Sequence, residues 1–163
     1  MRNMIARGRV EKDEWVYGLP IESKLFSGDN VNTICIVTKP GLQWVDELYM
    51  TYEDCIAVEA NSVGWFTGIT DKNGIRIFEG DIIKWRDSTD LSVGGQIAEV
   101  CYGEYIDVDS HFDDVYLLGF YFKLFDKDKT CATINWLNEY KNDFEIIGNI
   151  YDNPELLEVD SDE

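Results

Sequence analysis

Histidine-based chemistry in this chain would have to use His111, the only histidine in the sequence. His111 follows Asp109 and Ser110, which are the residue types of a serine-hydrolase triad, but a triad is defined by its geometry and not by adjacency in sequence. The sequence has no Gly-x-Ser-x-Gly motif, in which a sharp turn exposes a nucleophilic serine, and Ser62 is not part of one. We therefore predict no catalytic residues. A single histidine also excludes a metal site with several histidine ligands.

The densest group of carboxylates is a second place where chemistry could occur. Its members are Glu104, Asp107, Asp109, Asp113 and Asp114. Oxygen ligands at alternating positions suit Ca²⁺ or Mg²⁺. An EF-hand loop that begins at Asp107 would need Gly at its sixth position and Glu at its twelfth, where the sequence has Phe112 and Leu118. We interpret residues 104–114 as a solvated surface loop, with a weak cation site as the alternative, and we predict no cofactor and no metal ligands.

Other site signatures are also missing from the sequence. Gly94-Gly95 lacks the Lys-Ser/Thr pair of a phosphate-binding loop. With 32 acidic residues, pairs of carboxylates arise by chance, so none can be assigned to acid–base catalysis. The cysteines have no C-x-x-C spacing typical of zinc or redox sites, and we expect free thiols, mostly buried, in a reducing compartment. They are Cys35, Cys55, Cys101 and Cys131.

The net charge limits the classes of partner. The chain has 14 Lys and Arg against 32 Asp and Glu, a formal net charge of -18. Residues 1–66 have 10 acidic and 6 basic residues, net -4, and residues 67–163 have 22 and 8, net -14. This field repels nucleic acid and anionic lipid, and it attracts basic partners or keeps the protein soluble. No signal peptide and no apolar run of about 18 residues are found, so we expect a cytoplasmic protein that does not enter a membrane.

Short β-branched and aromatic runs between turn signals predict a mainly β (β-rich α+β) fold. The strongest turn signal is Asn73-Gly74, which predicts a β-hairpin. Three- and four-residue spacing of apolar residues predicts a short helix over 42–52, residues 133–140 fit a helix or a strand, and Pro154 begins a final turn. The predicted strands are Glu14–Ile21, Asn32–Thr38, Cys55–Val58, Trp65–Ile69, Ile75–Phe78, Ile82–Trp85, Gln96–Tyr102, Tyr116–Phe125 and Phe144–Tyr151.

The strand Tyr116–Phe125 is apolar on both faces and needs to be covered by its own chain or by a second subunit, as in a homo-oligomer. The aromatic residues around it could instead form a surface on which nucleic-acid bases stack. These residues are Tyr102, Tyr105, Phe120, Tyr121, Phe122 and Phe125. Without basic residues nearby such a surface lacks its electrostatic component, so we favour a core or a subunit interface.

Three blocks occur in a distinctive order and spacing. They are WVYG at 15–18, GWFTGITDKNGIRIFEGDIIKW at 64–85 and GNIYDNPELL at 148–157. The chain resembles the YopX family of phage and prophage proteins in these blocks. The resemblance implies an SH3-like β-barrel over residues 64–157, a smaller N-terminal part over 1–63, and a phage or prophage origin. The acidic composition of residues 158–163 predicts a disordered tail. The resemblance implies no biochemical activity.

Within these blocks, the sequence predicts structural roles. We expect Gly68, Gly74 and Gly80 at turns, and Asp81 bonded to turn amides. Asn149 and Asn153 are expected to hold the last strand and turn. Alternation predicts four core side chains, which are Ile75, Ile77, Ile82 and Trp85.

The function expected from the sequence is that of a non-enzymatic protein–protein interaction module whose protein partner is unknown. A first alternative is an acidic mimic of nucleic acid that inhibits a host protein. A second is an SH3-like barrel that binds nucleic acid, against which the charge argues. An enzyme is the remaining alternative, and no set of residues indicates one.

Overall fold

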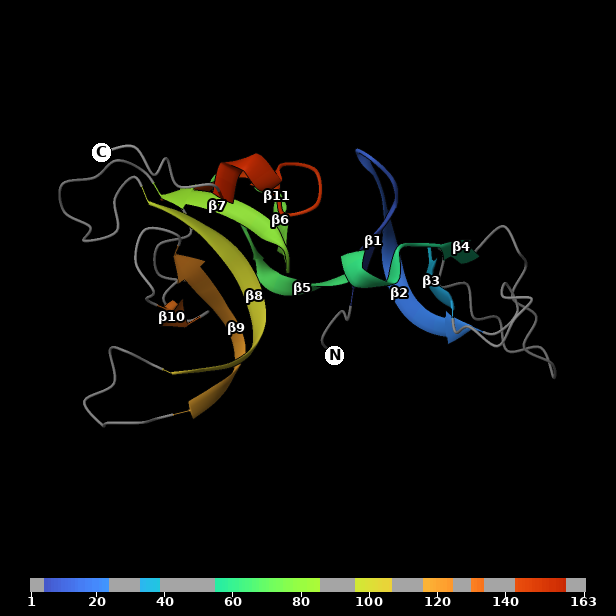
Figure 1. The fold of residues 1–163 in the computed structure, drawn as a ribbon, viewed down its shortest axis with the longest axis horizontal. Coiled ribbons are helices and arrows are strands. Elements are labelled where there is room, and N and C mark those ends of the chain that lie inside the picture. Colours follow the sequence, from blue (N-terminus) through green and yellow to red (C-terminus); the bar gives the residue numbers. More distant parts are fainter. Residues whose placement is uncertain are drawn as a thin grey trace. The chain divides into compact units, whose positions relative to one another are not determined.

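The computed structural model describes residues 5–23, 33–38, 55–85, 96–106, 116–124, 130–133 and 143–157. The chain divides into two compact units, Met1–Phe66 and Thr67–Glu163. Each unit is described by itself (Figure 1). The predicted helix over 42–52, the segment 134–140 and the tail 158–163 lie outside the described residues.

The first unit is an antiparallel sheet of short strands. Its strand order is β4-β3-β2-β1, followed by the start of β5. The bounds are β1 Ala6–Glu11, β2 Glu14–Ser23, β3 Thr33–Val37, β4 Cys55–Ala57 and β5 Gly64–Thr70, with a short 3₁₀ helix, η2, at Ala60–Ser62. The hairpin between β1 and β2 turns at Asp13, which has a positive φ of 61°, a conformation that Asp tolerates better than most residues.

Strand β1 has no counterpart among the predicted strands. Several of its residues are polar, so the sequence does not indicate that the strand is buried. Arg7 is buried, and its guanidinium lies 4.5 Å from the centre of the Trp15 ring. The aliphatic stem and the flat cation can both be covered by an aromatic neighbour. On β2 the alternating residues Tyr17 and Leu19 are exposed, so their alternation indicated a strand but not its inner face.

The second unit contains a five-stranded antiparallel sheet in the order β10-β9-β8-β7-β11. Its strands are β7 Asp81–Trp85, β8 Ile97–Ile106, β9 Tyr116–Leu124, β10 Thr130–Thr133 and β11 Phe144–Asn149. The end of β5 pairs with β6 (Arg76–Phe78), and the 3₁₀ helix η3 spans Pro154–Leu157. Among the described strands, β10 and β11 are open edges of this sheet, so the pairing does not close a barrel, and the SH3-like barrel stays a prediction.

One hydrophobic core joins the β5–β6 hairpin to the five-stranded sheet. Trp85 lies at its centre, with the Phe122 ring centroid at 5.2 Å and the Phe144 ring centroid at 6.3 Å, both in edge-to-face geometry. Such pairs add to the free energy gained by burying aromatic area. The other buried members are Ile69, Ile77, Ile83, Ala98, Val100 and Leu124.

The predicted hairpin and most predicted strands are confirmed, and two details are wrong. Ile75 was expected in the core but is 54% exposed, because it lies in the turn before β6 begins and does not follow the strand's alternation. Gly68 was expected at a turn but lies inside strand β5, with a φ of 95°. Ile77, Ile82 and Trp85 are buried as predicted.

Candidate interaction surface

Strands β8 and β9 form a long two-stranded ribbon with a continuous register. Ala98 lies opposite Leu124 and Val100 opposite Phe122, and these pairs belong to the core. The pairing continues without a shift from Tyr102–Phe120 to Ile106–Tyr116. Figure 1 shows the two strands curving together away from β7 and β11. We call residues 97–100 with 122–124 the core half, and residues 102–106 with 116–120 the outer half.

Every second side chain of the outer half lies on the same face as the core residues, since a strand alternates its side chains with a period of two. This face is apolar beyond the end of the core. We name it the ribbon stripe, and its residues are Tyr102, Glu104, Ile106, Tyr116, Leu118 and Phe120. Leu118 is 70% exposed and Tyr116 is 67% exposed. The face that builds the core thus continues as an exposed apolar surface.

Among the described strands, none pairs with the two edges of the outer half. β7 pairs with β8 only from Ile97 to Glu99. β10 pairs with β9 only from Tyr121 to Lys123. A two-stranded ribbon is marginally stable alone and depends on packing of one face. The outer half is held by its register and by contacts such as the Tyr102–Phe120 pair, whose ring centroids are 5.0 Å apart.

The opposite face of the ribbon is more enclosed. The Tyr105 and Tyr121 rings stack at 5.3 Å with an interplanar angle of 29°. Burial raises the pKa of the Cys101 thiol to about 12, and the Glu99 carboxylate adds to the rise. Burial also raises the pKa of Tyr121, with Cys101 contributing. The thiol and the phenol therefore stay protonated near neutral pH and have no nucleophilic character.

The six aromatic residues considered as a base-stacking surface do not form a single face. Tyr102 and Phe120 lie on the ribbon stripe, Tyr105 and Tyr121 stack on the other side, and Phe122 is in the core. Phe125 lies outside the described residues. Strand alternation thus divides the set into two faces.

Two buried carboxylates in the second unit serve the backbone. Asp71 Oδ1 accepts hydrogen bonds from the amides of Asn73 at 2.8 Å and Ile75 at 2.9 Å, and its Oδ2 accepts one from the Ile146 amide at 3.3 Å. Asp81 Oδ2 accepts a hydrogen bond from the Phe78 amide at 2.7 Å, as predicted for a turn. A buried carboxylate needs such donors, and these two hold the hairpin and the following turn.

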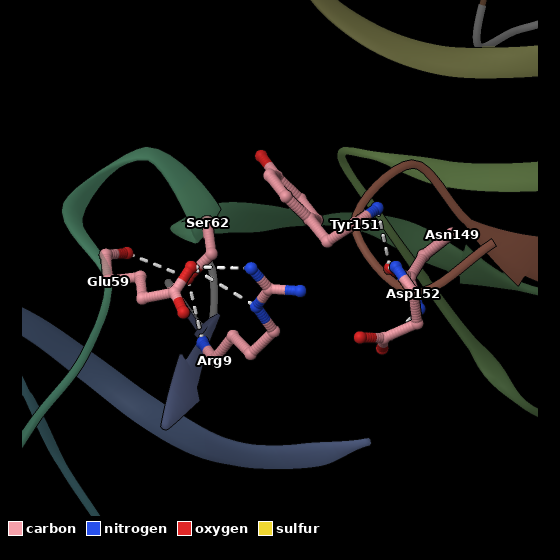
Figure 2. A network of polar contacts seen from close by, with 6 residues as sticks. All are labelled: Arg9, Glu59, Ser62, Asn149, Tyr151 and Asp152. Carbon is pink, nitrogen blue, oxygen red and sulfur yellow. Dashed lines mark hydrogen bonds and ion pairs between the residues drawn. The ribbon is translucent and has the colours of Figure 1, made fainter. Parts of the chain in front are cut away.

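The last strand and turn are organised by asparagine side chains (Figure 2). Asn149 Oδ1 accepts hydrogen bonds from the amides of Tyr151 and Asp152, both at 3.0 Å. Asn153 Oδ1 accepts one from the Asn149 amide at 3.3 Å, which confirms the predicted roles of both asparagines. A Cβ at Gly148 would lie only 2.5 Å from Asn153 Oδ1, so any larger residue at this position would displace the Asn153 side chain.

The first unit has its own polar group, also drawn in Figure 2. The Arg9 guanidinium donates to a Glu59 carboxylate oxygen at 2.6 Å, and the Arg9 amide donates to Ser62 Oγ at 2.8 Å. Ser62 Oγ donates in turn to the Glu59 carbonyl at 2.7 Å. Ser62 is fully buried, and its hydroxyl links the residue before η2 to strand β1, which is a structural role.

The buried thiols of the first unit share one small cluster with Val37. Cys35 and Cys55 are both buried and free. Burial and the neighbouring Cys55 thiol raise the pKa of Cys35 to about 11. As predicted, these cysteines are free and buried. The side chain of Cys131 lies outside the described part of the structure.

The acidic segment is only partly covered by the structure. Glu104 lies on β8 and points to the exposed ribbon stripe, whereas residues 107–114, including His111, lie outside the described residues. Within the described ranges no group of three or more His, Cys, Asp or Glu residues is arranged to hold a metal ion. In the same ranges no helix is long and apolar enough to cross a membrane.

Comparison with known proteins identifies the family. The family model described as YopX protein matches residues 11–158, which is most of the chain. The chain belongs to the YopX family. No curated protein matches it. Among solved structures, this YopX-family chain is similar to protein EF1440 from Enterococcus faecalis, with 22% sequence identity, coverage of 95% of this chain and 97% of the other, and a TM-score of 0.46.

The ribbon stripe was only partly visible in the sequence of this YopX-family protein. The aromatic run 116–125 indicated a surface in need of cover, but it could not show that Phe122 and Leu124 are buried while Tyr116 and Leu118 are exposed. The signal that could have found the difference is the mismatch in strand lengths. β8 and β9 are long, and their neighbours β7 and β10 are short.

Proposed function

We propose that this YopX-family protein is a non-enzymatic protein–protein interaction module of phage or prophage origin that acts in the cytoplasm of a bacterial host. The observation that carries the proposal is the exposed ribbon stripe. Apolar side chains of this size, gathered on one face and continuous with the core, are typical of a surface that binds another macromolecule.

The polar groups of the second unit support a role without catalysis. Asp71 and Asp81 accept hydrogen bonds from backbone amides, and Asn149 organises a turn. The Cys101 thiol and the Tyr121 phenol have raised pKa values because of burial, which removes them as nucleophiles at neutral pH.

The test compares the wild-type protein with a double variant of the ribbon stripe and a control variant elsewhere on the surface. Y116S/L118S removes the two most exposed members of the ribbon stripe, and I75S removes an exposed isoleucine elsewhere in the second unit. Tagged proteins are incubated with extract of the bacterium that carries the gene, and bound proteins are identified by mass spectrometry. We expect a protein retained by the wild type and I75S and lost with Y116S/L118S. Equal retention by all three would contradict the proposal.

A second candidate function is mimicry of nucleic acid, in which the acidic surface occupies a host DNA- or RNA-binding protein. The net charge of -14 in residues 67–163 favours it. Under this hypothesis the retained proteins would be basic nucleic-acid binders, duplex DNA would displace them, and Y116S/L118S would retain them. Direct binding of nucleic acid by an SH3-like barrel is a third candidate. The charge predicts that an electrophoretic shift assay shows no complex.

A further inference from the structure

The side chains of the ribbon stripe indicate which chemical groups a binding partner must have. Three successive cross-strand pairs form its surface, from Tyr102–Phe120 through Glu104–Leu118 to Ile106–Tyr116. Five of the six side chains are aromatic or aliphatic, and Glu104, which is exposed, lies between them. A partner that covers Leu118 therefore meets the Glu104 carboxylate opposite it.

In the sequence, all charged residues from Asp87 to Phe122 are acidic. The sequence contains no Lys or Arg between Asp87 and Phe122, which includes all of β8 and most of β9. Glu104 is the one charged side chain of the stripe, and residues 67–163 have a net charge of -14. Covering Glu104 without an opposite charge would leave a desolvated carboxylate, which is costly.

A second copy of this chain does not fit that requirement. In a two-fold dimer the same patch meets itself, so the interface would enclose two Glu104 carboxylates and no cation from either ribbon stripe. Like charges brought together at an interface disfavour the complex. A segment with Lys or Arg beside its apolar residues can contact the apolar side chains of the stripe and also neutralise its carboxylate. Its cations neutralise Glu104, and Arg can also stack on exposed tyrosine rings such as Tyr102 and Tyr116.

We infer that the ribbon stripe binds a basic, apolar segment of another protein, in which aromatic or aliphatic side chains are accompanied by Lys or Arg. This inference rests on the proposed function and names the partner's chemistry. The apolar contacts provide most of the affinity, and the acidic field accelerates encounter and selects basic partners.

The test uses three short synthetic peptides of equal length with the full-length protein at near-physiological salt. The first combines Lys and Arg with Leu and Tyr, the second keeps the basic residues but replaces Leu and Tyr with Ser, and the third keeps Leu and Tyr but replaces the basic residues with Glu. Binding is measured by fluorescence anisotropy. We expect the first peptide to bind at least about tenfold more tightly than either other peptide, a difference of about 1.4 kcal/mol.

Variants assign the binding to the stripe. L118S should weaken binding of the first peptide by about tenfold or more, E104K should weaken it and reduce its salt dependence, and I75S should leave it unchanged. Thermal unfolding of each variant confirms that the fold is retained. Leu118 and Ile75 are both largely exposed, so serine at either position should be tolerated.

The outcomes separate this inference from the proposed function. If the acidic apolar peptide binds as tightly as the basic one and L118S weakens both, the stripe is an interaction surface but the basic partner is wrong. If none of the peptides binds, or light scattering shows a dimer that L118S dissociates, the inference is also overturned. If the serine peptide binds as tightly as the apolar one and L118S has no effect, only the general acidic field is at work, and both proposals fail.

Discussion

The core half and the outer half of the β8–β9 ribbon have the same register, the same alternation and similar residue types. They differ in how far their side chains are exposed to solvent. Phe122 is fully buried beside Trp85, whereas Leu118, four residues earlier on the same face, is 70% exposed. The difference arises from the neighbours, since β7, β11 and the β5–β6 hairpin cover one half only. Residue type alone therefore does not separate a core side chain from a contact side chain. Strand length relative to the neighbouring strands does.

The largest expected effect compares F122A with L118A. F122A removes a ring from the centre of the core and should lower the free energy of unfolding by about 3–5 kcal/mol. L118A removes a solvent-exposed side chain and should change it by less than about 0.5 kcal/mol. Urea unfolding followed by tryptophan fluorescence measures both. A loss of several kcal/mol in L118A would show that the outer half is covered within the monomer and would end the distinction between the halves.

The next comparison uses glycines. G148A places a Cβ against Asn153 Oδ1 and Leu156 Cδ1, which would disturb the last turn and should cost about 1–3 kcal/mol. G119A is the matched control in the outer half of β9, where a Cβ would meet nothing within 4 Å, and it should be close to neutral. Denaturant unfolding of the two variants gives the answer. Equal losses would mean that the outer half is as tightly enclosed as the last turn.

These two comparisons also show which parts of the structure the sequence could predict. Asn73-Gly74 specifies its hairpin by local turn chemistry, and the side chains of Asp81, Asn149 and Asn153 bond to backbone within a few residues, so their roles followed from local spacing. Strand β1 was not predicted, because the burial of Arg7 depends on Trp15 across the sheet. Ile75 was placed in the core because its alternation was assumed to continue through the turn. The candidate surface was predicted only as an apolar strand, since exposure depends on which strands end early.

A smaller effect concerns a buried hydroxyl on the core side. Thr67 Oγ1 donates to the Ile77 carbonyl at 2.9 Å and joins β5 to β6. T67V keeps the shape and removes the donor, so it should cost about 1 kcal/mol, whereas T67S keeps the hydroxyl and should retain the hydrogen bond. E104Q provides the comparison in the outer half and should be nearly neutral in unfolding, because Glu104 is exposed. If T67V and E104Q changed the free energy of unfolding equally, the hydrogen bond from Thr67 to the Ile77 carbonyl would make no measurable contribution to stability.

The smallest expected effect is a shift in titration without a measurable change in stability. Lys72 forms an ion pair with Glu145, and this hydrogen-bonded contact lowers the pKa of the Glu145 carboxyl below the usual value of a glutamate. A lowered pKa in the folded state favours folding above the pKa of the unfolded chain, and the contribution is lost as the pH falls through the folded pKa. Both side chains are exposed, so solvent screening keeps the contribution small.

K72M should therefore raise the pKa of Glu145 toward the usual value of a glutamate, and K123M, which removes the same charge from β9, should leave the pKa of Glu145 unchanged. Carbon-detected NMR of the side-chain carboxyl measures the titration. The shift in K72M should be incomplete, because Asn73 Nδ2 still lies 3.4 Å from Glu145 Oε1 and its hydrogen bond also favours the charged form. An unchanged pKa in K72M would mean that the ion pair is not formed in solution. The β11 end of the sheet would then be held by hydrogen bonds such as the one that the Ile146 amide donates to the Asp71 carboxylate, with no contribution from the Lys72–Glu145 ion pair.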